Sequence, residues 1–295
     1  MSFKDEYAKF TQPSPAREAF VYKAITSLSR DQIVKSMKPI SVKRPDGATL
    51  TYRVMPDYVM IDGVRVPMSG NTAQRVADHF GLSLPSAAMA KEIYQNADIK
   101  VPARPLSGSG TNVDGRQYSG KEVVDTGVGY APFAINYNNK INKQLSDHGA
   151  KEGEIVSGFA KDIVAPPSSG KLGLYGLFDA NGKPIQGGTG STPHDTTIHS
   201  EYGSFVRLVS PDVEITYPDG KKEKKSTKDV YQISSYNPSP KDKPMTPLPP
   251  SSTPGGKPQK GSSKEQQVAQ YTPGKPRPGR LSFLERIDNF LSEIS

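Results

Sequence analysis

The sequence contains no cysteine among its 295 residues. This absence excludes disulfides, cysteine-ligated zinc sites and thiol nucleophiles, and it leaves the redox compartment open. Long apolar runs are missing as well: the longest extend over a few residues, whereas about 18–20 are needed to cross a bilayer. The first residues lack the basic-then-apolar order of a secretion signal. We therefore expect no transmembrane segment, and either a cytoplasmic location or release by a phage-like or other unconventional route.

Several sequence signatures of catalysis are also absent. The chain has no Walker loop, no glycine-rich dinucleotide turn and no Gly-x-Ser-x-Gly elbow, so the common nucleotide-binding and hydrolase motifs give no guidance. Histidine occurs only four times. Any general base or metal ligand of the imidazole type must therefore come from a very short set of candidates.

Proline is abundant in one segment. Residues 237–280 hold eleven Pro and five Gly, with eight Lys or Arg against two acidic residues. This composition cannot bury a core, so the segment is predicted to be a disordered basic tether that carries most of the formal charge of +8. Such a tether contacts anionic polymers, including peptidoglycan-associated ones, or serves only as a soluble linker.

The last fifteen residues, 281–295, change character again. Ser282 and Glu285 match a capping box, which predicts an amphipathic helix. A helix of this length is marginal alone in water, so we expect it to dock on a protein partner or on its own domain. Its candidate partner-binding residues form one apolar stripe: Leu284, Ile287, Phe290, Leu291 and Ile294.

The other residues predict an α+β fold. Apolar spacing and caps predict helices, and turn dipeptides between apolar runs predict hairpins and strands. The helices are expected at 14–37, 72–80, 86–97 and 139–145. Strands are expected around the turns at 45–47 and 62–63 and at 155–159, 172–178, 205–209, 213–217 and 230–233, with the lysine-rich run 221–225 as a solvated hairpin tip. The expected regions are an α+β part at 1–100, a linker or long loop at 101–120, a mainly antiparallel β-rich part at 121–236, the tether and the docking helix.

The histidines suggest where chemistry takes place. His194, Asp195 and His199 offer imidazole and carboxylate ligands for a divalent metal, although their spacing brings them to one ion only from an irregular loop. We expect no other cofactor. Ser204 follows closely and would need a neighbouring base as a nucleophile, for which His194 and His199 are the local candidates. His148, in a polar segment, is a further candidate base.

Residues 202–208 carry a resemblance to the catalytic segment of L,D-transpeptidases, which are cell-wall enzymes. That segment runs His-Gly-Cys-x-Arg-Leu, and here Tyr202 stands for the histidine, Ser204 for the cysteine, and one extra residue precedes Arg207. The resemblance implies a wall-directed site in which Arg207 is a catalytic residue, and the departures imply a degenerate one.

A second resemblance covers more of the chain. Residues 52–78 and 160–209 are similar to a family of uncharacterised bacterial proteins that have a His-Gly-x-Arg-Leu-Val element in place of residues 202–209. This family brings no established activity. It implies that residues 40–236 form one cooperative unit.

The two expected helices at 72–80 and 86–97 offer an alternative, because Ala77 and Gly81 have the separation of a helix-turn-helix. The second helix has no arginine, so phosphate anchoring and guanine recognition are poor and nucleic acid is a disfavoured partner.

The hypothesis that the resemblances favour is a bacterial or phage-encoded factor that acts on the cell envelope by hydrolysing or binding peptidoglycan. Whether it is an enzyme stays open at this point. The alternatives are a structural or cargo protein of a phage-like particle, docked by its C-terminal helix, and a DNA-binding protein.

The tether generates a first prediction. Limited proteolysis should cut between residues 237 and 280 before any other place, because extended, solvated backbone enters a protease site without unfolding. Mass spectrometry of the fragments checks this outcome. Early cleavage within residues 1–236 with an intact tether would show that the tether is packed.

Overall fold

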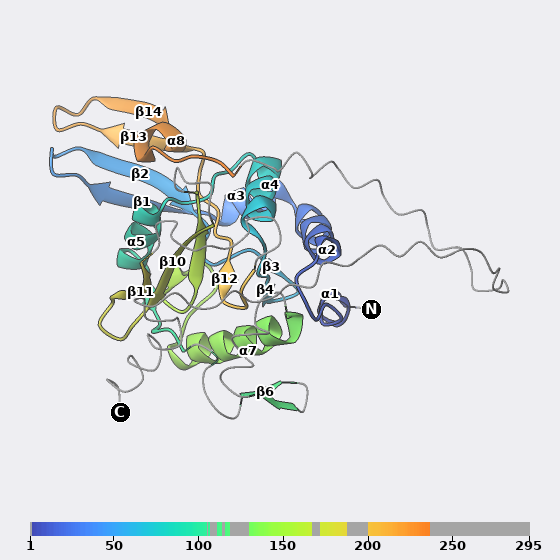
Figure 1. Ribbon diagram of the computed structural model, residues 1–295. Helices are drawn as coiled ribbons and strands as arrows, with labels where there is room; N and C mark the ends of the chain where they lie inside the picture. The colour runs from blue at the N-terminus through green and yellow to red at the C-terminus, as the bar shows by residue number, and fades with distance from the viewer. Residues whose placement is uncertain are drawn as a thin grey trace, which may run out of the picture. The chain divides into compact units, whose positions relative to one another are not determined.

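A computed structural model describes residues 2–104, 106, 111–113, 116–118, 130–166, 172–187 and 200–236 (Figure 1). Its helices are α1 (Phe3–Tyr7), α2 (Pro15–Thr26), α3 (Arg30–Ser36), α4 (Gly70–Phe80), α5 (Ala87–Gln95), α7 (Ala131–Asp147) and α8 (Thr227–Tyr231). The strands are β1 (Lys38–Lys43), β2 (Thr49–Val54), β3 (Met60–Ile61), β4 (Val64–Arg65), β5 (Ile99–Lys100), β6 (Thr111–Val113), β7 (Arg116–Tyr118), β8 (Val156–Ser157), β9 (Lys161–Val164), β10 (Gly173–Phe178), β11 (Pro184–Gly187), β12 (Ser204–Phe205), β13 (Asp212–Thr216) and β14 (Lys222–Ser226). The α+β class is confirmed, with mostly antiparallel sheets.

The N-terminal helices begin at serine caps. Ser14 caps α2, whose first residue is Pro15, and Ser29 caps α3 by accepting a hydrogen bond from the backbone N–H of Gln32. The prediction of one helix over 14–37 is therefore wrong. The chain leaves the helical path after Thr26 because Ser29 satisfies the first amides of a new helix.

The first sheet has the strand order β1-β2-β13-β14, and all its pairs are antiparallel (Figure 1). The predicted turn at Pro45-Asp46-Gly47 joins β1 to β2, and Asp46 accepts the Ala48 N–H in that turn. Alternation directs Leu50, Tyr52 and Val54 of β2 inward. These side chains pack against Met89 and Ile93 of α5.

Two predictions for the end of this sheet are wrong. Residues 221–225 are not a hairpin tip: most of the run belongs to β14, where lysines of the strand form ion pairs with Glu214 and Asp212 of β13. Residues 230–233 are not a strand, although Val230 and Ile233 have strand propensity. Ser226 instead caps the short helix α8 by accepting the Asp229 N–H.

The second sheet has the order β11-β10-β9-β12. β10 pairs antiparallel with β9 and β11, whereas the short strand β12 pairs parallel with β9. Parallel pairing requires a long connection between the strands, and the chain runs through β10 and β11 before it returns at Ser204.

The helix predicted at 139–145 is much longer. Phe133, Tyr137, Ile141 and Leu145 repeat every four residues along α7 and form one buried face. Pro132 lies in its first turn, where a missing backbone donor costs nothing. The sequence interpretation recognised only the C-terminal half of this helix. The stretch 101–120, expected as a linker or long loop, contains the short β6–β7 hairpin.

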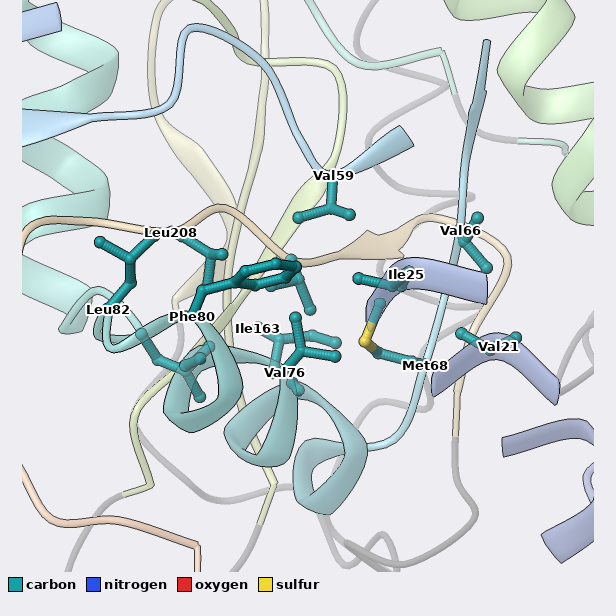
Figure 2. Close-up of a cluster of buried hydrophobic side chains, with 14 of the residues drawn as sticks. Val21, Ile25, Val59, Val66, Met68, Val76, Phe80, Leu82, Ile163 and Leu208 are labelled. Carbon is teal, nitrogen blue, oxygen red and sulfur yellow. The ribbon is translucent and has the colours of Figure 1, made fainter. Parts of the chain in front are cut away.

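The main hydrophobic core lies between α2, α4 and the segments around β3, β4 and β12. Figure 2 shows Val76 and Phe80 of α4 directed toward Val59 and Ile163, with Leu208 alongside. All five side chains are buried. Packing of this kind accounts for the amphipathic pattern that predicted α4.

Gly158 generates a stability prediction. It has a φ of +107°, and a Cβ added there would lie 2.3 Å from the carbonyl oxygen of Val101. We expect Gly158→Ala to lower the free energy of unfolding by more than ~3 kcal/mol, because backbone strain and a backbone clash act together.

Gly63 is the matched control for this measurement. Its φ is +71° and nothing lies within 4 Å of an added Cβ, so Gly63→Ala isolates the conformational cost, about 1 kcal/mol. Denaturant titration of both variants gives the comparison. Equal losses would show that the approach of Val101 to Gly158 contributes nothing.

Candidate functional site

Strands β9 and β12 position the chemically distinctive side chains of the second sheet. Their register pairs Ser204 with Lys161 and Phe205 with Asp162. Paired residues of adjacent strands lie on the same face, and successive residues alternate between faces. Lys161 and Ser204 therefore share one face of the sheet, and Asp162 lies on the other.

The first group is the Lys161 cluster, which consists of Lys161, Glu201 and Ser204. The Lys161 ammonium forms an ion pair with the Glu201 carboxylate. Glu201 is held close by the turn before β12, in which the Ser204 N–H donates to the Glu201 carbonyl over 3.1 Å. The Glu201 side chain is 22% exposed, so the cluster reaches the surface there, while Lys161 is buried.

Burial sets the charge balance of this cluster. It lowers the pKa of Lys161 from 10.5 to about 7, because the desolvated ammonium is disfavoured. The Glu201 carboxylate acts in the opposite direction by favouring the charged form. A lysine whose pKa is lowered by burial is able to act as a proton acceptor.

Ser204 is the unusual member of the cluster. Its side chain is 1% exposed, and its Oγ has no hydrogen-bond partner in the part of the chain that the structure describes. A buried hydroxyl without a partner is uncommon and calls for an explanation. Ser204 of β12 is the register partner of Lys161 of β9, so the two side chains lie on the same face of the sheet.

The second group is the Arg207 cluster, on the opposite face. Arg207 is fully buried and donates hydrogen bonds to the carbonyls of Met55 and Pro56 (2.9 and 2.8 Å) and of Val156 (2.7 Å). Its guanidinium lies 4.4 Å from the centre of the Tyr58 ring. These contacts give Arg207 a structural role in joining separate chain segments.

Asp162 completes the Arg207 cluster. Its Oδ1 lies 3.6 Å from the Nε of Arg207, and its Oδ2 accepts a hydrogen bond of 3.4 Å from the Tyr58 hydroxyl. Burial raises the pKa of Asp162 from 3.8 to about 6, although the nearby Arg207 charge acts to lower it.

The predicted site residues do not all fall within the described structure. His194, Asp195 and His199 lie outside the described residues, as do Leu284, Ile287, Phe290, Leu291 and Ile294 of the expected docking helix. Their predicted roles as metal ligands, bases and partner-binding residues stay predictions. Within the described ranges, no three His, Asp or Glu side chains gather as metal ligands.

His148 is described and is exposed. It ends α7, and its Nδ1 lies 2.8 Å from the carbonyl oxygen of Gln144. Among the described residues, no hydrogen bond or ring contact joins His148 to Ser204. Strand register pairs Ser204 with Lys161, and the Ser204 hydroxyl forms no hydrogen bond with the Lys161 side chain.

The helix pair considered as a helix-turn-helix is packed into the core. In α5, Met89, Ala90 and Ile93 are buried against the first sheet. The segment between α4 and α5 forms a bridge from Ser83 to Val209. A recognition helix needs an exposed face for the major groove, and α5 exposes little besides Lys91 and Gln95.

Comparison of the chain with protein families, with curated proteins and with solved structures gave no match in any of the three. Among the helices that the structure describes, none combines the length and the apolar character of a membrane span.

The sequence interpretation missed Lys161, Asp162 and Glu201. One signal for the first two was present: they are adjacent charges within the otherwise apolar run 159–164. Buried charges in a strand are rare unless they are paired, so such a run indicates a buried polar cluster. The pairing of Lys161 with Ser204 spans more than forty residues and had no local signal.

Asp162 generates a prediction about pH. Its pKa is raised on folding, so between pH 4 and 6 the native state binds more protons than the unfolded state, and this residue's contribution to stability falls as pH rises. Relative to Asp162→Asn, the wild type should lose about 2–3 kcal/mol of unfolding free energy from pH 4 to 6.5.

Denaturant titrations at pH 4, 5, 6.5 and 7.5 provide this measurement. Asp147→Asn, which removes an exposed ion pair with Lys143 on α7, is the control. It should change the unfolding free energy by less than about 0.5 kcal/mol at each pH. If the unfolding free energy of the wild type relative to Asp162→Asn instead rises with pH, Arg207 keeps Asp162 charged.

Proposed function

We propose that the chain is a serine hydrolase of the cell envelope, in which Ser204 is the nucleophile, Lys161 its general base, and an amide bond of peptidoglycan the substrate. The observation that carries the proposal is the strand register that places Ser204 beside Lys161 on one face of the sheet. The Ser204 hydroxyl is buried without a hydrogen-bond partner among the described residues, and burial lowers the pKa of Lys161 to about 7. The resemblance of residues 202–208 to a wall enzyme and the basic tether support the substrate class.

The chemistry requires a proton acceptor beside the nucleophile. Neutral Lys161 takes the proton of the Ser204 hydroxyl while Oγ attacks the amide carbonyl carbon. Lys161 then gives this proton to the leaving amine, and an acyl ester remains on Ser204. A water molecule, deprotonated by Lys161, hydrolyses the ester and restores both residues.

Glu201 has a positioning role in this proposal. Its carboxylate pairs with the Lys161 ammonium and holds the lysine side chain at one place. It also stabilises the ammonium that forms when Lys161 accepts a proton. Glu201 is the partly exposed member of the cluster, whereas Lys161 and Ser204 are buried.

Active-site labelling tests the nucleophile. A fluorophosphonate probe should label Ser204 in the full chain, and Ser204→Ala should abolish both labelling and the release of soluble fragments from purified peptidoglycan. Lys161→Met should lower the rate by about 10²–10⁴, the usual contribution of a general base. The activity should rise with pH through about 7, since Lys161 acts in its neutral form.

Ser157 provides the matched control. It is as buried as Ser204 but lies on β8, away from Lys161, so Ser157→Ala should keep labelling and activity. Retained activity in a folded Ser204→Ala protein would refute the nucleophile. Labelling of Ser204 without release of soluble fragments would support a serine hydrolase and refute peptidoglycan as its substrate.

A further inference from the structure

The first sheet has an open pocket of about 570 Å³ at the end where its two hairpins turn. Leu50 of β2 and Ile215 of β13 are register partners, and their side chains, together with Ala48, form its floor. Val230 of α8 and Tyr217 line the pocket beside this floor. None of the residues that line the pocket belongs to the Lys161 cluster.

The floor of the pocket is apolar. Ala48, Leu50 and Ile215 are all buried within the cluster that packs the first sheet, while Val230 and Tyr217 at its edge are partly exposed. Pockets of this size and lining accept small molecules with an apolar body. The apolar surface that the body of a ligand would cover comes mainly from the partly exposed side chains of Tyr217 and Val230.

Arg44 gives the pocket a cation. Its guanidinium lies 5.4 Å from the centre of the Tyr231 ring, and it forms no hydrogen bond or ion pair with any residue that the structure describes. Two acidic side chains in this region form other contacts, and one of them, Asp46, itself lines the pocket. Asp46 accepts the Ala48 N–H of the turn, and Glu223 accepts a hydrogen bond of 2.7 Å from the Tyr217 hydroxyl and pairs with Lys225.

We propose that this pocket binds a small amphipathic anion, with an apolar chain or ring on Leu50 and Ile215 and a carboxylate or comparable group on Arg44. An arginine that is half-buried and lacks an acidic partner is suited to an anion, because a guanidinium forms paired hydrogen bonds with carboxylates. The apolar lining and the Arg44 guanidinium together fit a ligand with both parts, although the Asp46 carboxylate also lines the pocket. This site is independent of the proposed hydrolase.

Two amphiphiles of opposite charge test the proposal. Calorimetric titration of the full chain with decanoate and with decyltrimethylammonium, both below their micelle concentrations, should detect binding of decanoate only. Arg44→Gln should weaken decanoate binding at least tenfold, and Val230→Asp, which places a carboxylate at the edge of the pocket, should abolish it.

Lys43→Gln is the matched control. Lys43 precedes Arg44 and is exposed, and Lys43→Gln removes the same charge as Arg44→Gln. This variant should therefore leave decanoate binding unchanged. Equal binding of the two amphiphiles, or equal weakening by Arg44→Gln and Lys43→Gln, would overturn the proposal. Sedimentation with phosphatidylglycerol vesicles identifies the source of the ligand. Vesicle binding that is lost in Arg44→Gln indicates a membrane lipid, and vesicle binding that does not depend on Arg44 indicates a free amphiphile.

Discussion

The buried guanidinium of Arg207 is the interaction on which the centre of the molecule depends. A desolvated charge is costly unless its donors are used, and Arg207 donates to the carbonyls of Met55, Pro56 and Val156 while Asp162 lies beside it. Those residues come from segments far apart in the chain. The requirement to satisfy one buried charge therefore joins the loop after β2, the strand β8 and the strand β9, none of which could hold this arrangement alone.

This constraint also positions the proposed nucleophile. Ser204 lies three residues before Arg207, so a fixed Arg207 fixes where β12 meets β9. β12 pairs through only two residues, and a strand that short has little register preference of its own. The side chain of Arg207 supplies that preference from the opposite face. A residue that the sequence resemblance assigned to catalysis thus supports Ser204 by position, through the backbone.

Local chemistry explains which elements the sequence predicts well. Turn residues at 45–47 and 62–63 and the serine caps of α4 and α5 act within a few residues, and those hairpins and helices are present. The failures have a common origin. Val230 favours a strand by propensity, yet the cap at Ser226 and packing against the first sheet decide for helix. The position of Lys161 beside Ser204 was unpredictable, because it depends on the parallel pairing of β9 with β12, which are far apart in the sequence.

The buried arginines and Ser204 differ in how far their hydrogen-bonding groups are used, although the Nε atoms of Arg17 and Arg207 also lack a hydrogen-bond partner among the described residues. Arg17, Arg65 and Arg207 are all buried, and each donates to at least three oxygen atoms, as expected of groups that stabilise a fold. Ser204 makes no such bond, and burial shifts Lys161 toward its neutral form. The proton transfer that we propose between Lys161 and Ser204 is one reason for these states.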